Sequence, residues 1–270
     1  MNVLLLLFAL ILPFLIGFCL VSLCWPVHRL SVALFGCKMF LAISSGMGIS
    51  SLTTFFTLVL AGAPYFWGIL FFETALLAVL LGILRYKKIP LLPLLETPQT
   101  TPAGRLFSML RYGFYVTAIA AAGLFLLRSF ENPHGEPDAF YLWNSCARYL
   151  FRSGGHWRNV FTANTWSHPD YPLLLPANVL RLWVFWGKET LMSPIVIAFL
   201  YTALTIGLLV SALSATRGQR QGYIGGILLV STPYFIKHGA SQYADIPLGL
   251  YFLAVLVLIV FQDTFPKHAV

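Results

Sequence analysis

The sequence predicts an all-α polytopic integral membrane helix bundle with about seven transmembrane helices and one large outer loop. Of its 270 residues, 59% are hydrophobic and 10% are charged, whereas about 25% of a soluble domain is charged. Long apolar runs recur, and helices are the spanning form they predict because every backbone N–H and C=O must be satisfied within hydrocarbon. The net charge of +8 comes from basic residues at the ends of these runs, which favours membrane topology and argues against a nucleic acid partner.

The expected helices follow in chain order. They cover residues 3–24, a second run ending at 63, then 65–84, 107–127, 194–215, 223–236 and 246–261. The first has no basic residue before it, so we expect a retained helix and not a signal peptide. The second contains Lys38, which places its first turns at the interface, and small residues at 44–48, which indicate close helix packing.

Prolines divide the chain into three regions. Prolines 90, 93, 98 and 102 cannot continue a helix, so residues 89–104 are expected to form a cytoplasmic linker. Residues 1–88 then form an N-terminal three-helix membrane segment, and residues 105–270 form a second membrane region with an outer loop at 129–190. The four cysteines suggest neither a disulfide framework nor zinc spacing.

Basic residues set the expected orientation. With the C-terminus inside, the cytoplasmic side collects ten of the seventeen Lys and Arg residues, as the bias of cytoplasmic loops requires. They are Arg29, Lys38, Arg85, Lys87, Lys88, Arg105, Arg111, Arg217, Arg220 and Lys267. The N-terminus and the loop 129–190 are then outside.

The outer loop is expected to hold two interfacial helices. Residues 138–152 have an apolar face at three- and four-residue spacing, with Asn144, Arg148 and Arg152 on the other face. A second helix is expected from Pro176 to Gly187, since proline suits the first helical position. Both are predicted to lie with the apolar face toward lipid and the arginines toward phosphates.

Carboxylates beside cations predict group-transfer chemistry in this loop. A carboxylate can accept the proton of an acceptor hydroxyl, and cations can stabilise a departing phosphate. The alternative for Asp138 and Asp170 is a simple N-cap, a common role of aspartate. Asp245 is expected to open the last helix after a turn at 237–242, where the helix dipole favours an acid.

The motifs of the loop resemble those of a known superfamily. Asp138, Trp143, Asn144, Ala147 and Trp157 are followed by the run 168–176, His-Pro-Asp-Tyr-Pro-Leu-Leu-Leu-Pro, and later by 242–248, Gln-Tyr-Ala-Asp-Ile-Pro-Leu. Together they resemble bacterial GT-C glycosyltransferases, most closely the polyprenyl-phosphate-sugar enzymes related to protein mannosyltransferases and the lipid A aminoarabinose transferase. The resemblance covers residues 106–261 and makes 105–270 a partial GT-C-like core.

The resemblance implies a function and a set of site residues. It implies transfer of a hexose or pentose, with inversion, from a polyprenyl phosphate carrier to an extracytoplasmic glycan, lipid or protein, in the bacterial inner membrane. Asp138 is the expected base, with Asp170 and Asp245 as further catalytic acids. The expected substrate-binding residues are Glu136, Arg148, Arg152, Arg158, His168, Tyr171, Lys237 and His238. Neither a cofactor nor a metal is expected, and a second membrane chain completing the core is an expected partner.

Glu73 provides the competing hypothesis. An acid within a membrane helix is a functional candidate, so a transporter that uses Glu73 as a proton relay is an alternative, as is a non-catalytic subunit of a glycan assembly complex. A structural role, in which Glu73 accepts a hydrogen bond from a Ser or Thr of the second helix, stays open. A metal site formed by Asp138, His168 and Asp170 would require folding to bring them together.

Overall fold

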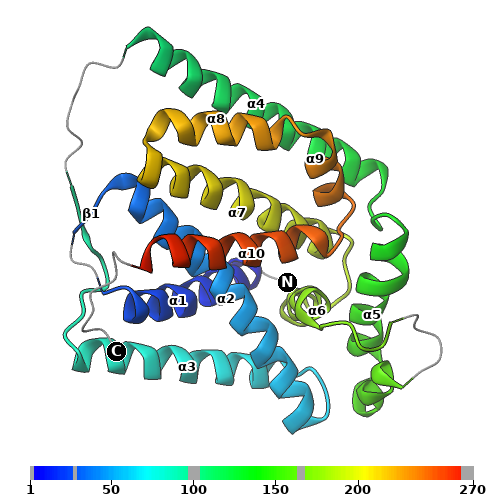
Figure 1. Ribbon diagram of the computed structural model, residues 1–270. Coiled ribbons are helices and arrows are strands. Elements are labelled where there is room, and N and C mark those ends of the chain that lie inside the picture. Colours follow the sequence, from blue (N-terminus) through cyan, green and yellow to red (C-terminus); the bar gives the residue numbers. More distant parts are fainter. Residues whose placement is uncertain (1–2, 27–28, 97–103, 163–167, 263–270) are drawn as a thin grey trace.

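A computed structural model describes residues 3–26, 29–96, 104–162 and 168–262, and the described chain is all-α apart from two short strands (Figure 1). Its α-helices are α1 (Val3–Cys24), α2 (Val32–Ala61), α3 (Phe66–Tyr86), α4 (Arg105–Glu131), α5 (Asn144–Arg152), α6 (Leu174–Trp186), α7 (Met192–Arg217), α8 (Gln219–Val230), α9 (Pro233–Ala240) and α10 (Asp245–Val260). A π-helical turn, η1 (Ala139–Trp143), leads into α5, and a 3-10 helix, η2 (Gly154–Phe161), follows it. Strand β1 (Arg29–Leu30) pairs in parallel with β2 (Leu94–Leu95).

Fewer helices are long enough to cross a bilayer than the sequence predicted. Within the described residues, α1, α2, α3, α4 and α7 qualify, and α9 with α10 adds a sixth only if this pair, bent by 116°, counts as one span. The expected seven spans are therefore corrected to five or six. Helix α8 has 12 residues and α10 has 16, so at about 1.5 Å per residue both are shorter than a hydrocarbon core of about 30 Å.

The elements around the segment that contains Asp138 lie at one end of the bundle. In Figure 1, α5, α6, α9 and the start of α10 lie toward the right, where α4 ends, whereas the β1–β2 pair lies on the left. Helices α7, α8 and α10 run side by side between these ends, and α4 lies along α8. This arrangement places the beginning of α10 beside the segment that contains Asp138.

Accessibility from the two sides of the membrane tests the predicted orientation. A membrane-impermeant maleimide applied to intact cells should label Asn159→Cys in η2 and should not label Gln219→Cys at the start of α8, both being exposed positions. The background should carry Cys24→Ser, because Cys24 is exposed. The opposite labelling pattern would contradict the orientation. A cysteine at Asn164 would report the same face but lies outside the described residues.

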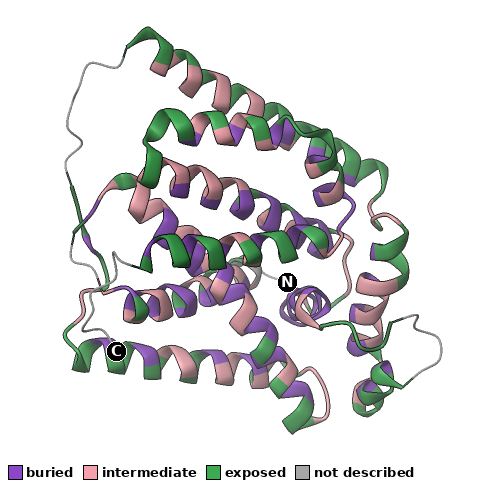
Figure 2. Cartoon of the chain, viewed as in Figure 1, coloured by how far each residue is buried: buried purple, intermediate pink, exposed green. Residues whose placement is uncertain are grey.

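Helix α6 is buried within the protein, so the prediction that its apolar face lies against lipid is wrong. Every residue from Leu175 to Phe185 is buried, and α6 contacts α1, α2, α3, α5 and α7 (Figure 2). Its sequence is apolar on all sides except at Asn178 and Arg181, and a helix that is hydrophobic all round belongs in a core. Both polar side chains have buried partners.

Glu73 is one of these partners. Its side chain is fully buried in α3, and Arg181 donates to both of its carboxylate oxygens, from Nε at 2.7 Å and from Nη2 at 2.6 Å. Arg181 also donates to the carbonyl of Ala9, and Thr53 of α2 donates to Glu73 at 3.3 Å. The expected hydrogen bond from a Ser or Thr of the second helix is confirmed, and the arginine adds the pairing that a charge at this depth requires.

Helix α2 packs closely on α1, as its small residues indicated. A Cβ added to Gly46 would collide with the carbonyl oxygen of Pro13, and one added to Gly17 would collide with that of Ala42. The Lys38 side chain is buried in the protein, with Nζ 5.3 Å from the centre of the Phe18 ring. Contact with the aromatic face stabilises a cation in an apolar setting.

Candidate functional site

Two of the three predicted catalytic acids line one cavity. This cavity, called the acid cavity below, has a volume of about 610 Å³ and is lined by Asp138, Trp143, His168, Tyr171 and Asp245, with apolar neighbours from α6 and α10. Asp138 precedes η1, and Asp245 is the first residue of α10. The fold therefore brings together two carboxylates that are far apart in the sequence.

Neither loop aspartate acts as a helix cap. Asp138 stands at the N-cap position of η1 without a side-chain capping hydrogen bond, and α6 has Leu173 at its N-cap position in place of Asp170. The capping role proposed for both residues is therefore absent. Asp245 lies in the first turn of α10 as expected, where the helix dipole favours its negative charge.

Asp170 faces a second cavity. This cavity has a volume of about 650 Å³ and lies against α2, from which Ser45, Ser51 and Phe55 line it. Tyr171 contributes to both cavities. The segment from Asp170 to Leu174 thus separates the two cavities, and Asp170 does not share the space lined by Asp138 and Asp245.

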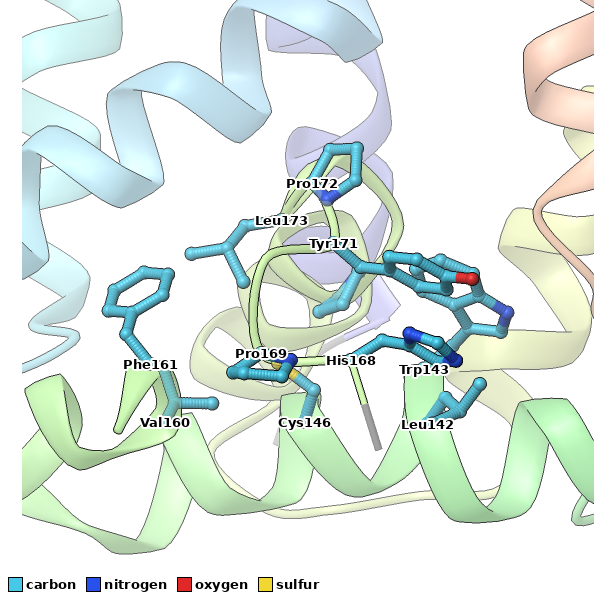
Figure 3. Close-up of a pocket in the computed structure, with 11 residues that line it drawn as sticks. Leu142, Trp143, Cys146, Val160, Phe161, His168, Pro169, Tyr171, Pro172 and Leu173 are labelled. Carbon is cyan, nitrogen blue, oxygen red and sulfur yellow. The ribbon is translucent and has the colours of Figure 1, made fainter. Parts of the chain in front are cut away.

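Three aromatic rings form a stack in the wall of the acid cavity. The Tyr171 ring lies 4.4 Å from the His168 ring at an interplanar angle of 6°, and 5.3 Å from the Trp143 ring at 15°. Figure 3 shows these rings together on one side of a small hollow of about 30 Å³, with Phe161 on the opposite side and Cys146 between them. Two of the predicted binding residues, His168 and Tyr171, are thereby placed at the site.

Cys146 should resist alkylation in the folded protein. Burial raises the pKa of its thiol to about 12, and the thiolate is the reactive form, so the thiol stays protonated at pH 8 and loses its proton only as the pH approaches 12. Iodoacetamide at pH 8 should modify the exposed Cys24 and leave Cys146 unmodified until the protein unfolds. Peptide mass spectrometry measures this, and equal rates at both cysteines would contradict it.

The predicted arginines lie away from the acid cavity. Arg152 makes a two-point ion pair with Glu189, from Nε at 2.5 Å and from Nη2 at 2.8 Å, and this hydrogen bonding raises the pKa of its guanidinium. Arg148 lies over the Phe140 ring, and burial lowers its pKa. Arg158 lies over the Trp157 ring with its Cζ 4.8 Å from the ring centre. Among the described residues, no Arg or Lys lines the acid cavity.

Glu136 and Lys237 share a separate hollow. They line a space of about 180 Å³ together with Arg128 and Ser241. The expected turn at 237–242 is wrong, because Pro233 starts the new helix α9, which continues to Ala240, in keeping with the preference of proline for the first turn. Lys237 and His238 are therefore helical residues.

Tyr243 lies near His238 and near three acidic side chains. The His238 ring lies 5.7 Å from the Tyr243 ring. Burial, and then the charges of Asp138, Glu136 and Asp245, raise the pKa of the Tyr243 phenol, with a smaller opposing effect from the Asp138 backbone. Tyr243 thus lies among three acids. Sequence reasoning assigned it no role, although it stands two residues before Asp245.

The donor set of the acid cavity does not form a metal centre. Within the part of the chain that the structure describes, no group of three or more His, Cys, Asp or Glu side chains is arranged to hold a metal ion. Comparison of the chain with protein-family models, curated proteins and solved structures gives no match.

Proposed function

We propose that the protein is a membrane glycosyltransferase, or part of one, that moves a sugar from a polyprenyl phosphate carrier to an extracytoplasmic acceptor. The observation that supports this most is the pairing of Asp138 and Asp245 in one cavity of about 610 Å³. Ligand sites typically measure about 300–1,000 Å³ and combine apolar or aromatic walls with few polar groups. The resemblance of the loop motifs to GT-C enzymes supports the same reading.

The proposed reaction is a single displacement. A hydroxyl oxygen of the acceptor attacks the anomeric carbon of the sugar while the bond from that carbon to the carrier phosphate oxygen breaks. Asp138 accepts the hydroxyl proton, and the carrier leaves as polyprenyl phosphate. One displacement inverts the anomeric carbon. Asp245, on the other wall, accepts hydrogen bonds from sugar or acceptor hydroxyls and so orients them.

The aromatic stack provides a flat apolar wall for this chemistry. Trp143, Tyr171 and His168 lie nearly parallel at the cavity, and the apolar face of a sugar ring fits against such a surface while its hydroxyls face the acids. We place the lipid part of the carrier nearest the second cavity, where Ile49, Leu52 and Phe55 provide apolar lining.

The carrier phosphate needs a cation from outside the acid cavity. Arg152 is least suited, because its guanidinium fork is occupied by Glu189. Lys237 forms no ion pair within the described residues and lines the hollow beside Glu136, two residues before Asp138. We therefore favour Lys237 as the phosphate contact.

The transport alternative loses its main support in this fold. Both carboxylate oxygens of Glu73 accept hydrogen bonds from Arg181, and the side chain has no exposure. A relay carboxylate must exchange protons with a water-accessible path, and this ion pair occupies the group. These contacts favour a structural role for Glu73 over a proton relay.

Release of free carrier tests the proposed function. The protein is purified in detergent and mixed with a sugar-loaded polyprenyl phosphate and an extract that contains extracytoplasmic acceptors. It should release polyprenyl phosphate, which mass spectrometry detects. A membrane extract should be added in a parallel sample to supply any partner chain. Absence of release in both samples would contradict the proposal.

A further inference from the structure

The two walls of the acid cavity are joined by a buried polar contact. We call it the junction; it comprises Gly135, Glu136, Asn144, Ser241 and Gln242. Asn144 Nδ2 donates to Gln242 Oε1 at 2.7 Å, and the backbone N–H of Glu136 donates to the carbonyl of Ser241 at 3.3 Å. Both hydrogen bonds join the segment that contains Asp138 to residues 241–242, which shortly precede Asp245.

Further hydrogen bonds complete the junction. Gln242 Nε2 donates to the carbonyl of Pro133 at 3.3 Å, and Asn144 Nδ2 also donates to the carbonyl of His134 at 3.2 Å. The Asn144 and Gln242 residues are only 2% and 3% exposed. A buried amide that loses its partner loses hydrogen bonds without regaining water, so these side chains hold each other in place.

The sequence predicted that Asn144 lies on the polar face of its helix together with Arg148 and Arg152, opposite the apolar face, and this assignment is wrong. Asn144 points into the protein, whereas Arg152 is exposed and paired with Glu189. Because Asn144 lies at the start of α5, directly after the π-helical turn η1, its side chain does not follow the face of the later turns.

The backbone at the junction is constrained as well. Gln242 has a φ of +62°, which side-chain-bearing residues rarely adopt, and Gly135 on the facing loop has a φ of +77°. A Cβ on Gly135 would lie 2.9 Å from the Ser241 carbonyl oxygen and 3.1 Å from Gln242 Oε1. Such strain persists where surrounding contacts enforce it, and it gathers at functional sites.

We propose that Asn144 and Gln242 are positioning residues that hold the Asp138 and Asp245 walls at a fixed separation. The catalytic consequence rests on the proposed function, whereas the structural statement does not. Neither residue lines the acid cavity, so both act through the segments that they join. Misplacing a reacting group by about 1 Å costs about 10²-fold in rate, which makes this separation important for transfer.

Pulsed electron paramagnetic resonance tests the separation without an activity assay. Spin labels at Tyr141→Cys in η1 and Phe252→Cys in α10, both 68% exposed, report on the two walls in a Cys24→Ser background. The parent should give one narrow distance distribution. Asn144→Leu and Gln242→Ala should each broaden it or shift its mean, because the walls separate.

Matched controls distinguish the junction from a general loss of packing. Asn178→Leu removes a buried amide of α6 that contacts Tyr201. Lys88→Gly changes the other non-glycine residue with a positive φ among the described residues. Both variants should leave the distance distribution unchanged. If Asn144→Leu does not fold, Gly135→Ala opens the junction through steric contact with Ser241 and Gln242 and through backbone strain at its positive φ. An unchanged distribution in every junction variant, or equal broadening in Asn178→Leu, would overturn the proposal.

Carrier release separates this proposal from the proposed function. Junction variants should lose about 10²-fold in kcat with little change in the KM of the carrier-linked sugar, since the residues that line each wall are unchanged. If the junction variants broaden the distance distribution but the parent releases no carrier, the positioning role of the junction is supported and the glycosyltransferase assignment is contradicted. If the distance distribution is unchanged in the junction variants but the parent releases carrier, the positioning role is contradicted and the glycosyltransferase assignment is supported.

Discussion

Arg181→Met should lower the free energy of unfolding by about 3–5 kcal/mol, because it leaves the buried Glu73 carboxylate without its partner. The side chains of this ion pair are 3% and 0% exposed, so water cannot replace the arginine. Thermal or denaturant unfolding in detergent measures the loss. The double variant Glu73→Leu with Arg181→Met should recover most of the stability, since two apolar side chains need no compensation.

An exposed ion pair provides the control for this prediction. Arg152→Met breaks the contact with Glu189, but the Arg152 side chain is 68% exposed, so the unfolding transition should not shift measurably. Equal effects of Arg181→Met and Arg152→Met would show that the α3–α6 pair is not a main stabilising contact. A double variant less stable than Arg181→Met would show that the unpaired Glu73 carboxylate does not cause the loss of stability.

Asp138→Asn should reduce carrier release by about 10²–10⁴-fold, the usual contribution of a positioned general base. Asparagine keeps the shape of aspartate but cannot accept the acceptor's proton at neutral pH. Because Asp138 makes no capping hydrogen bond, the melting temperature should stay near that of the parent. Release at an unchanged rate in Asp138→Asn would remove its assignment as the base.

Glu131→Gln is the matched control for the loss of an outer acid. Glu131 ends α4, is exposed and pairs with Arg128 at 3.2 Å, and it does not line the acid cavity. Its substitution changes the net charge as Asp138→Asn does. Activity should therefore stay near the parent value, and a comparable loss would indicate an effect of surface charge instead of a catalytic one.

Much of the architecture could be predicted because it depends on local sequence. Apolar runs and flanking prolines predicted an all-α chain with helices that could span a membrane, and they placed α1, α3 and α4 within a few residues of their observed bounds. The helix expected at 138–152 is present as η1 followed by α5. Hydrophobic periodicity and helix-breaking residues act over one or two turns, so helices can be predicted from them without knowledge of the tertiary structure.

The depth of α6 could not be predicted in this way. A short apolar helix suits an interface or a core equally well, and the choice depends on whether Arg181 finds a partner. That partner, Glu73, lies on α3, far away in the sequence. The span count failed for a related reason, since the segments expected to form helices at 223–236 and 246–261 form the short helix α8 and the bent pair of α9 and α10.

The candidate site was predictable only in part. The motif residues Asp138, His168, Tyr171 and Asp245 do line one cavity. The arginines do not, because the direction of a side chain depends on how its helix packs, and the sequence shows only its spacing. Arg152 points to Glu189 in the connection between α6 and α7, a contact that no local pattern indicates.

Carrier release by the parent, Asp138→Asn, Asp245→Asn and the double variant, assayed together, tests the shared acid cavity most directly. If both acids act on one bound substrate pair, each single variant loses activity by orders of magnitude, and the double variant is no slower than the worse single one, because groups that act as a unit are not additive. Parent-level release in Asp245→Asn, or losses that multiply fully in the double variant, would contradict one site formed by both acids.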